Sequence, residues 1–214
     1  MTFIRSLAYN IRMKVGDILK KKMLEKMLAD NQGILKTADV VAAGISKETF
    51  YQYVKCAELE KAAHGIYVSP AAWVDEMYLL QVQIPKAVYS HEAALYLHDL
   101  AEKEPMPLTV TVPAKYNSPA LAEKGARVVY VKKEWHMMGV CQMRSPGGYT
   151  IHVYDMERTI CDIVRKRSEM DIAVFNYALK EYMKRRDKNL GRLMEYASTM
   201  RLEKKIRETM GVLF

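Results

Sequence analysis

Apolar residues recur at helical spacing in the first part of the chain. Between residues 15 and 29 they stand three or four positions apart, as on one face of an amphipathic helix. The sequence Asp-Asn-Gln-Gly at 30–33 follows directly and is typical of a turn. We therefore predict one helix over residues 15–29 that ends at this turn.

Two shorter helical segments follow. Thr37 can cap a helix over residues 38–43, and Gly44 can take the left-handed conformation that ends it. Ser46 can then cap a third helix that runs to about Cys56. The pattern thus predicts three consecutive helices, with a glycine-containing turn between the second and the third.

A short hairpin is predicted after these helices. Strands at 59–62 and 66–69 flank Ala63-His64-Gly65, which can form a glycine-containing turn. Helix-turn-helix units dock their second helix in the DNA major groove, and in the winged variant a hairpin follows. The order of the elements therefore predicts a winged helix-turn-helix domain.

The boundary between two domains is expected near residue 83. Ser69-Pro70 is typical of a helix start, since proline is favoured at the first helical position, and this helix should continue to Ile84-Pro85. The expected domains are a DNA-binding domain over residues 1–83, of which 1–14 form an N-terminal extension, and a second domain over residues 84–214.

The second domain mixes strands and helices. The expected strands are 87–89, 108–112, 127–132, 139–143 and 149–153, the last two joined as a hairpin. The expected helices are 91–100 with Ser90 as its cap, 118–125, and a series that begins at Asp155. The predicted fold class is α+β, with an N-terminal winged helix-turn-helix domain followed by a mixed α/β domain with a C-terminal helical cluster.

The charge of the chain points to a class of partner. Its 214 residues include 33 basic and 25 acidic side chains, for a net charge of +8. Residues 1–69 hold 11 basic and 7 acidic side chains and residues 156–214 hold 14 and 9, whereas the middle is close to neutral. Basic proteins attract polyanions such as nucleic acid, although excess charge can also serve solubility alone.

Cysteines and apolar runs favour a cytoplasmic protein. Cys56, Cys141 and Cys161 are an odd number without a C-x-x-C pair, which is typical of reduced thiols. No apolar stretch reaches the roughly 18–20 residues of a membrane span, so we expect no membrane partner. Met13-Lys14 reads like a natural start, which leaves open whether the chain begins at Met1 or Met13.

The outer face of the third predicted helix carries side chains that can read DNA. At 100° per residue, Phe50 and Tyr53 share the inner face. On the outer face, Gln52 can bridge adenine N6 and N7, and Lys55 can take guanine acceptors or phosphates. The alternative is that this polar face is merely solvated.

Further candidates would hold the DNA backbone. Hydroxyl groups on the same helix can reach phosphate oxygens, its N-terminus offers free backbone N–H groups, and the hairpin can approach the backbone or the minor groove. These candidates are Thr49 and Tyr51 on the helix, Ser46 and Lys47 at its N-terminus, and Lys61 and His64 on the hairpin.

Basic residues also cluster in the C-terminal part. Arg158 and Asp162 stand four residues apart and can pair across one helical turn, and this structural role is sufficient to explain them. The functional hypothesis is a second basic surface for a partner or for nucleic acid, and the alternative is a solvated helix face. This surface would comprise Arg158, Arg165, Lys166, Arg167, Lys184, Arg185 and Arg186.

Catalytic and metal-binding motifs are weak in this sequence. Ser90-His91 lacks the G-x-S-x-G context of a nucleophile, and His91 and His98 lack the H-E-x-x-H spacing of a zinc site. Gly147-Gly148 lies in a predicted hairpin rather than before a helix, unlike a phosphate-binding loop. We therefore expect no enzymatic activity, no metal and no cofactor.

Several motifs follow one another in a specific order. They are Tyr89-Ser90-His91-Glu92-Ala93-Ala94-Leu95, Thr109-Val110-Thr111-Val112-Pro113 and Asp155-Met156-Glu157-Arg158-Thr159-Ile160-Cys161-Asp162. The segments 30–37, 44–46, 59–61 and 65–68 add a pattern that many winged-helix proteins share. Over about residues 15–190, the chain resembles the AbiEi-type antitoxins of abortive-infection toxin–antitoxin systems.

The resemblance implies a role in phage defence. It implies a winged-helix repressor that binds inverted repeats in its own promoter, joined to a C-terminal domain that neutralises a nucleotidyltransferase-like toxin encoded beside it. It leaves open whether the toxin is contacted directly. Since no heptad seam is present, we expect a monomer that pairs on DNA. The alternative function is a protein-interaction module that binds and masks a partner, with the winged helix as a scaffold.

Overall fold

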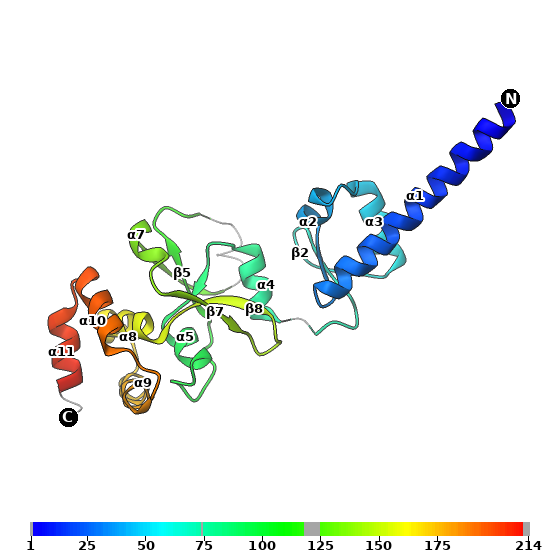
Figure 1. Ribbon diagram of the computed structural model, residues 1–214. Helices are drawn as coiled ribbons and strands as arrows, with labels where there is room; N and C mark the ends of the chain where they lie inside the picture. The colour runs from blue at the N-terminus through cyan, green and yellow to red at the C-terminus, as the bar shows by residue number, and fades with distance from the viewer. Residues whose placement is uncertain (1, 74, 118–124, 212–214) are drawn as a thin grey trace. The chain divides into compact units, whose positions relative to one another are not determined.

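The computed structural model describes residues 2–73, 75–117 and 125–211, with side chains from residue 16 onward. The chain forms two compact units, of which the first ends at residue 74 and the second begins at Asp75. Each unit has its own sheet (Figure 1). The predicted mixture of helices and strands is confirmed, and the predicted helix at 118–125 lies almost wholly outside the described residues.

The first unit combines helices with a three-stranded antiparallel sheet in the order β1-β3-β2. The predicted helix over 15–29 is part of a longer one that begins at Thr2. β1 was not predicted, because three residues are too few for an alternating pattern to stand out. The elements are α1 (Thr2–Asp30), β1 (Ile34–Lys36), α2 (Thr37–Ala42), α3 (Lys47–Cys56), β2 (Glu60–Ala63) and β3 (Ile66–Val68).

Thr37 does not cap α2 as predicted. It is the first residue of the helix, and the preceding Lys36 has the N-cap backbone conformation without a side-chain cap bond. The Thr37 N–H donates instead to the Gly65 carbonyl at 2.8 Å. This bond attaches the start of α2 to the turn of the β2–β3 hairpin.

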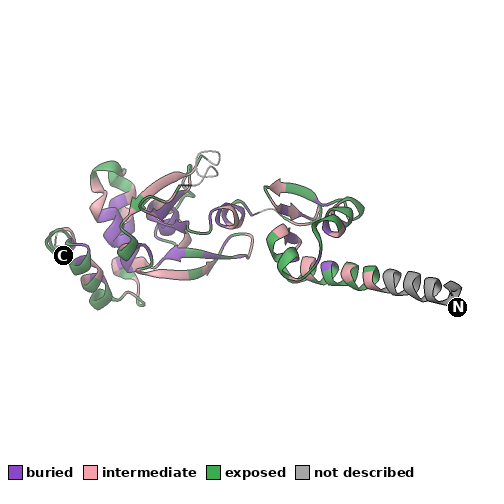
Figure 2. Cartoon of the chain, turned by 90° about the horizontal axis from the view of Figure 1, so that it is seen from above, coloured by how far each residue is buried: buried purple, intermediate pink, exposed green. Residues whose placement is uncertain are grey.

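A small apolar core holds the first unit together (Figure 2). Ile45 and Phe50 from the α2–α3 region pack with Leu24 of α1 and Leu35 of β1. All four are at most 2% exposed, so the short helices owe their stability to this packing rather than to their length.

Two glycines of the first unit provide a matched test of backbone strain. Gly33 (φ +86°) and Gly44 (φ +81°) are both left-handed, but a Cβ at Gly33 would lie 2.6 Å from the Ala72 Cβ, whereas one at Gly44 would meet no described heavy atom within 4 Å. We expect Gly44→Ala to cost about 1 kcal/mol of unfolding free energy and Gly33→Ala about 2 kcal/mol, because only the second adds a steric overlap. Urea unfolding followed by circular dichroism measures the unfolding free energy of both variants. Equal losses of unfolding free energy would show that a Cβ at residue 33 causes no costly steric overlap.

The second unit is built around a five-stranded mixed sheet in the order β6-β5-β4-β8-β7. The β4/β8 and β5/β6 pairs are parallel, and the β4/β5 and β7/β8 pairs are antiparallel. The elements up to the last strand are α4 (Glu76–Gln83), β4 (Val88–Tyr89), α5 (His91–Leu97), β5 (Thr109–Pro113), β6 (Arg127–Val131), α7 (Lys133–His136), β7 (Val140–Arg144) and β8 (Thr150–Tyr154).

The predicted helix start at Ser69-Pro70 is wrong. α4 begins at Glu76, and the Asp75 carboxylate caps it by accepting from the Tyr78 N–H at 2.9 Å. The Gln81 side chain on α4 donates to the His152 carbonyl and accepts from the His152 N–H at 2.8 Å. These bonds attach α4 to β8, so the helix belongs to the second unit. The division therefore falls at residue 74 rather than at residue 83.

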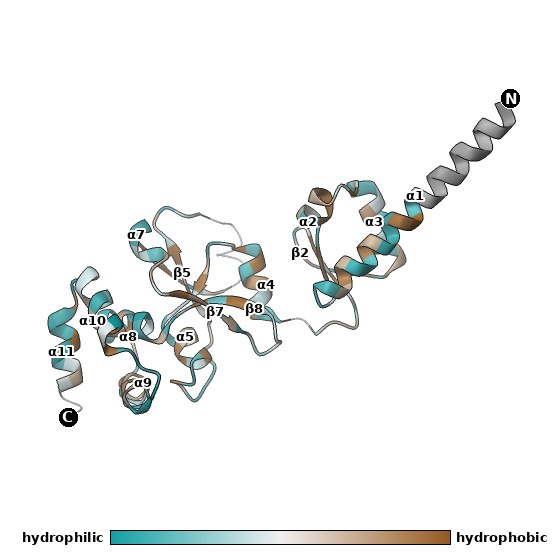
Figure 3. Ribbon diagram, in the orientation of Figure 1, coloured by the Kyte–Doolittle hydropathy of each residue, from teal (hydrophilic) through white to brown (hydrophobic). Residues whose placement is uncertain are grey.

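A helical cluster completes the second unit, as predicted from Asp155 onward. Its core includes Leu95 of α5 and Leu100, which follows that helix. Hydrophobic residues alternate with more polar ones along β5 and β8, whereas α11 is largely hydrophilic (Figure 3). The cluster consists of α8 (Met156–Arg165), a 3₁₀ turn (Arg167–Glu169), α9 (Ile172–Lys184), α10 (Leu190–Thr199) and α11 (Glu203–Gly211).

Candidate functional site

The N-terminus of α3 is built as predicted. Ser46 is the N-cap, and its hydroxyl oxygen accepts from the Thr49 N–H at 3.2 Å and lies 2.9 Å from the Thr49 hydroxyl. This cap satisfies one of the free N–H groups of the first turn. The Ser46 and Thr49 hydroxyls are therefore already engaged with each other, although Ser46 and Lys47 are exposed.

The two faces of α3 are separated as the periodicity predicts. Phe50 and Tyr53 are buried in the core of the first unit. Tyr51, Gln52 and Lys55 are exposed on the other side. The helix thus presents an aromatic, an amide and a cationic side chain to solvent from one rigid element.

The hairpin lies beside α3 through an aromatic contact. The ring centroids of Tyr51 and Tyr67 are 6.1 Å apart, and the rings of Phe50 and Tyr67 are T-shaped with their centroids 5.3 Å apart. Loss of solvent and the hydrogen-bonded Tyr51 hydroxyl raise the pKa of Tyr67. Tyr51 is therefore partly used in positioning the hairpin, and Tyr67, which sequence analysis did not single out, contributes to the same surface.

Three exposed lysines contribute positive charge to this surface. Lys61 faces Tyr67 across the hairpin, and it is exposed like Lys47 and Lys55. Within the described part of the chain, none of the three lysines lies within 4.0 Å of a carboxylate oxygen. His64 is exposed at the tip of the hairpin. All eight predicted DNA-contacting residues thus belong to one unit.

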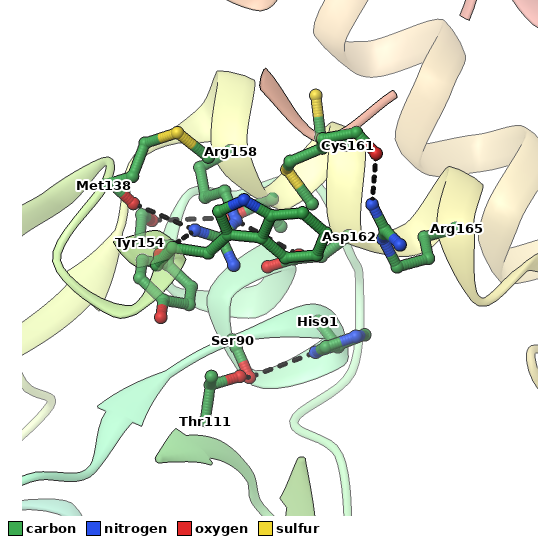
Figure 4. A network of polar contacts seen from close by, with 12 residues as sticks. Ser90, His91, Thr111, Met138, Tyr154, Arg158, Cys161, Asp162 and Arg165 are labelled. Carbon is green, nitrogen blue, oxygen red and sulfur yellow. Dashed lines mark hydrogen bonds and ion pairs between the residues drawn. The ribbon is translucent and has the colours of Figure 1, made fainter. Parts of the chain in front are cut away.

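Arg158 is not a surface residue, which corrects its assignment to a basic surface. Its side chain is 0% exposed. Its Nε donates to Asp162 Oδ1 at 3.1 Å, and its Nη1 donates to the carbonyls of Trp135 at 2.5 Å and Met138 at 3.1 Å (Figure 4). The structural pairing that the four-residue spacing suggested is the one that forms.

Arg165, Lys166 and Arg167 do not form one surface either. Arg165 donates to the Met200 carbonyl and lies over the Trp135 ring at 4.6 Å. Lys166 pairs with Glu169, and Arg167 lies over the Phe175 ring at 4.5 Å. All three residues are half-buried and each meets a different partner, so they do not form the exposed basic surface that was predicted.

The remaining predicted cluster is more exposed. Lys184 pairs with Glu181 and Arg185 with Asp187, which screens part of their charge. Arg186 is exposed. Lys184 and Arg186 are therefore the members of the predicted partner surface that remain available to solvent.

A basic groove in the second unit escaped sequence analysis. It measures about 520 Å³, and its lining includes Lys132, Trp135, Arg165, Arg201 and Lys205. These residues come from the β6–α7 connection, α7, the end of α8, and the α10–α11 region, which are up to 73 positions apart in the sequence (132 to 205). A local pattern carries no signal for such a set.

Neither a metal-binding cluster nor a membrane-spanning helix is present among the described residues. Among these residues, no group of three or more His, Cys, Asp and Glu side chains is placed to bind a metal ion. None of the described helices is long and apolar enough to cross a membrane.

Comparison with known proteins gives information about the fold. No model of a known protein family and no curated protein matches the chain. The crystal structure of the RV2827C protein from Mycobacterium tuberculosis is similar, with a TM-score of 0.57 and 12% sequence identity, over 82% of this chain and 70% of that chain. This similarity supports an α+β architecture for the chain.

Proposed function

We propose that this chain is a winged helix-turn-helix protein that binds double-stranded DNA, with α3 as the recognition helix. The single observation that carries the proposal is the two-faced arrangement of α3: Phe50 and Tyr53 are buried, while Tyr51, Gln52 and Lys55 are exposed. Gly44 is left-handed and separates α2 from α3, and the β2–β3 hairpin follows. This order of elements fits a helix-turn-helix with a wing.

In this proposal each side chain has a role set by its chemistry. Gln52 reads a base edge, while Lys55 and Lys47 contact phosphates at the rim of the groove. Thr49 and Tyr51 hydroxyls add polar contacts, and Ser46 keeps the helix N-terminus in place. Lys61 and His64 on the hairpin approach the neighbouring backbone.

The biological role that we propose follows the AbiEi resemblance. The chain would repress its own toxin–antitoxin promoter in the cytoplasm by binding inverted repeats as two monomers. Half-sites one helical turn apart would place the two copies about 34 Å from each other. The second unit would counteract a nucleotidyltransferase-like toxin.

Single substitutions on α3 test the assignment. We expect Gln52→Ala to reduce discrimination between operator and random DNA by about tenfold, because it removes a bidentate base contact. Lys55→Ala should weaken binding to operator and random DNA equally, because it removes a phosphate contact. For the same reason, the slope of log affinity against log salt concentration should fall in magnitude by about one. Fluorescence anisotropy with upstream and scrambled DNA at several salt concentrations measures both. If Gln52→Ala lowers the affinity for operator and random DNA equally, Gln52 does not contact a base.

A second candidate function is direct binding and masking of a protein partner by the second unit. The observation that favours it is the exposed pair Lys184 and Arg186 at the end of α9. Co-purification of the chain with the product of the neighbouring gene would support it. If the chain antagonises the toxin in cells but forms no complex with it, direct masking is excluded.

A further inference from the structure

A cavity of about 170 Å³ lies in the second unit beside the edge strand β6. Val129, Tyr130 and Val131 of this strand form one wall. His91 at the start of α5 and Asp162 of α8 contribute polar groups to the lining, together with Lys166 and residues shared with the basic groove. The cavity therefore combines an apolar wall with a few buried polar groups, as small-molecule sites do.

Two buried polar atoms of this lining have no hydrogen-bond partner among the described residues. They are Asp162 Oδ2, an acceptor, and Arg165 Nε, a donor. Asp162 is 2% exposed, and Arg158 engages its other oxygen. Leaving a buried carboxylate oxygen unpaired costs free energy that a ligand carrying a donor would recover. The two atoms call for a ligand that carries both a hydrogen-bond donor and an acceptor.

His91 is held in an unusual conformation at the same cavity. Its φ is +50°, in the left-handed region, and its Nδ1 lies 3.0 Å from the Ser90 hydroxyl (Figure 4). Ser90 does not cap α5 through its side chain as predicted, because its hydroxyl also accepts from Thr111 at 2.8 Å. Burial lowers the pKa of His91, which favours the neutral ring. Strained backbone of this kind is concentrated at functional sites.

The cavity adjoins the basic groove. Lys132, Trp135, Arg165 and Met200 line both, so a ligand in the cavity can extend into the groove. The groove adds Arg201 and Lys205, against one acidic residue, Glu134. The cationic groove suits a phosphate group, and the unpaired Asp162 oxygen beside the cavity calls for a hydrogen-bond donor. A ligand that fills both needs an anionic end and a neutral end that donates hydrogen bonds.

We propose that this site binds a nucleotide whose base carries an amino group. The base would enter the cavity, with its amino group donating to Asp162 Oδ2 and a neighbouring ring nitrogen or carbonyl oxygen accepting from Arg165 Nε. The phosphate would lie in the groove among Lys132, Arg201 and Lys205. Since every residue of the site belongs to the second unit, the proposal is independent of DNA binding by the first.

Trp135 allows binding to be measured directly. The chain has two tryptophans, so Trp73→Phe leaves Trp135 as the sole fluorophore. We expect saturable quenching by at least one of CMP, AMP and GMP, with a Kd at least tenfold lower than that of UMP or inorganic phosphate. UMP presents a carbonyl oxygen where CMP presents its amino group, so it is the matched ligand control for Asp162.

Two variants separate the parts of the site without touching the buried Arg158–Asp162 pair. Lys205→Glu should weaken nucleotide binding at least tenfold, whereas Lys204→Glu, next to it but outside the groove lining, should change binding less than twofold. Val129→Phe fills the cavity and should abolish the preference for an amino-bearing nucleotide while inorganic phosphate still binds. The proposal is overturned if no nucleotide gives saturable quenching, if phosphate or UMP binds as tightly as the others, or if Lys204→Glu matches Lys205→Glu.

Discussion

Replacing Arg158 with alanine is expected to lower the unfolding free energy of the second unit by about 3–5 kcal/mol. The substitution leaves the Asp162 carboxylate, 2% exposed, without its ion-pair partner, and it removes the donor to the Trp135 and Met138 carbonyls. It also removes a cation that lies 4.2 Å from the centre of the Tyr154 ring. Urea unfolding of the Trp73→Phe protein, followed by Trp135 fluorescence, measures the loss.

A double variant distinguishes an uncompensated charge from lost packing. Arg158→Met with Asp162→Leu removes both charges and keeps apolar volume, so it should recover at least half of the loss. Arg165→Ala is a useful comparison, since it removes a half-buried arginine from the same helix without stranding a buried ion-pair partner. A cost below about 1 kcal/mol for Arg158→Ala would show that Asp162 finds other partners or is hydrated.

The same residues give the segment at 155–162 a structural role. Asp155 caps α8 by accepting from the Arg158 N–H at 2.8 Å. Glu157 is 3% exposed and accepts from the Tyr182 hydroxyl at 3.2 Å and the Asn189 N–H at 2.8 Å. The motif that carries much of the AbiEi resemblance therefore joins α8 to the other helices of the cluster. Its polar residues stabilise the fold, and a partner surface must be sought elsewhere.

Local sequence patterns predicted the helices of the first unit because their signals are contained in a few residues. The Ser46 cap and the inward spacing of Phe50 and Tyr53 are properties of one turn or one helix face. The start of α4 was missed because Ser69-Pro70 has the local pattern of a helix start, whereas the structure places the cap at Asp75. The carboxylate at Asp75 prevails, since it also accepts hydrogen bonds from Ser145 and the Gly147 N–H, 70 and 72 residues away.

The two candidate sites also differ in how far local sequence patterns predict them. The exposed face of α3 could be predicted, because a helical period assigns each side chain to a face. The cavity beside β6 could not, because its two unpaired atoms arise from which bonds Arg158 and Arg165 make after packing. The basic run at 165–167 was misread as one surface for a related reason. The α8 helix ends there, and each of the three consecutive charges meets a different partner in the folded chain.

A pair of charge-reversal variants tests whether DNA binding belongs to the first unit. Lys47→Glu with Lys55→Glu is expected to weaken operator binding by about 100-fold at physiological salt and to lower the salt slope by about two. Both lysines are exposed on α3, so their reversal replaces two phosphate attractions by repulsions without disturbing the core. Anisotropy titrations against salt concentration measure both effects.

The matched control reverses two exposed charges of the second unit. Lys184→Glu with Arg186→Glu produces the same net charge, so a purely global attraction between a basic protein and DNA would weaken equally in both doubles. We expect the control to retain operator affinity within threefold. Equal losses would assign DNA binding to overall charge, and a larger loss in the control would move the interface to the second unit. If Lys184 and Arg186 instead serve the toxin, the control double should lose protection of growth against the co-expressed toxin while the α3 double keeps it.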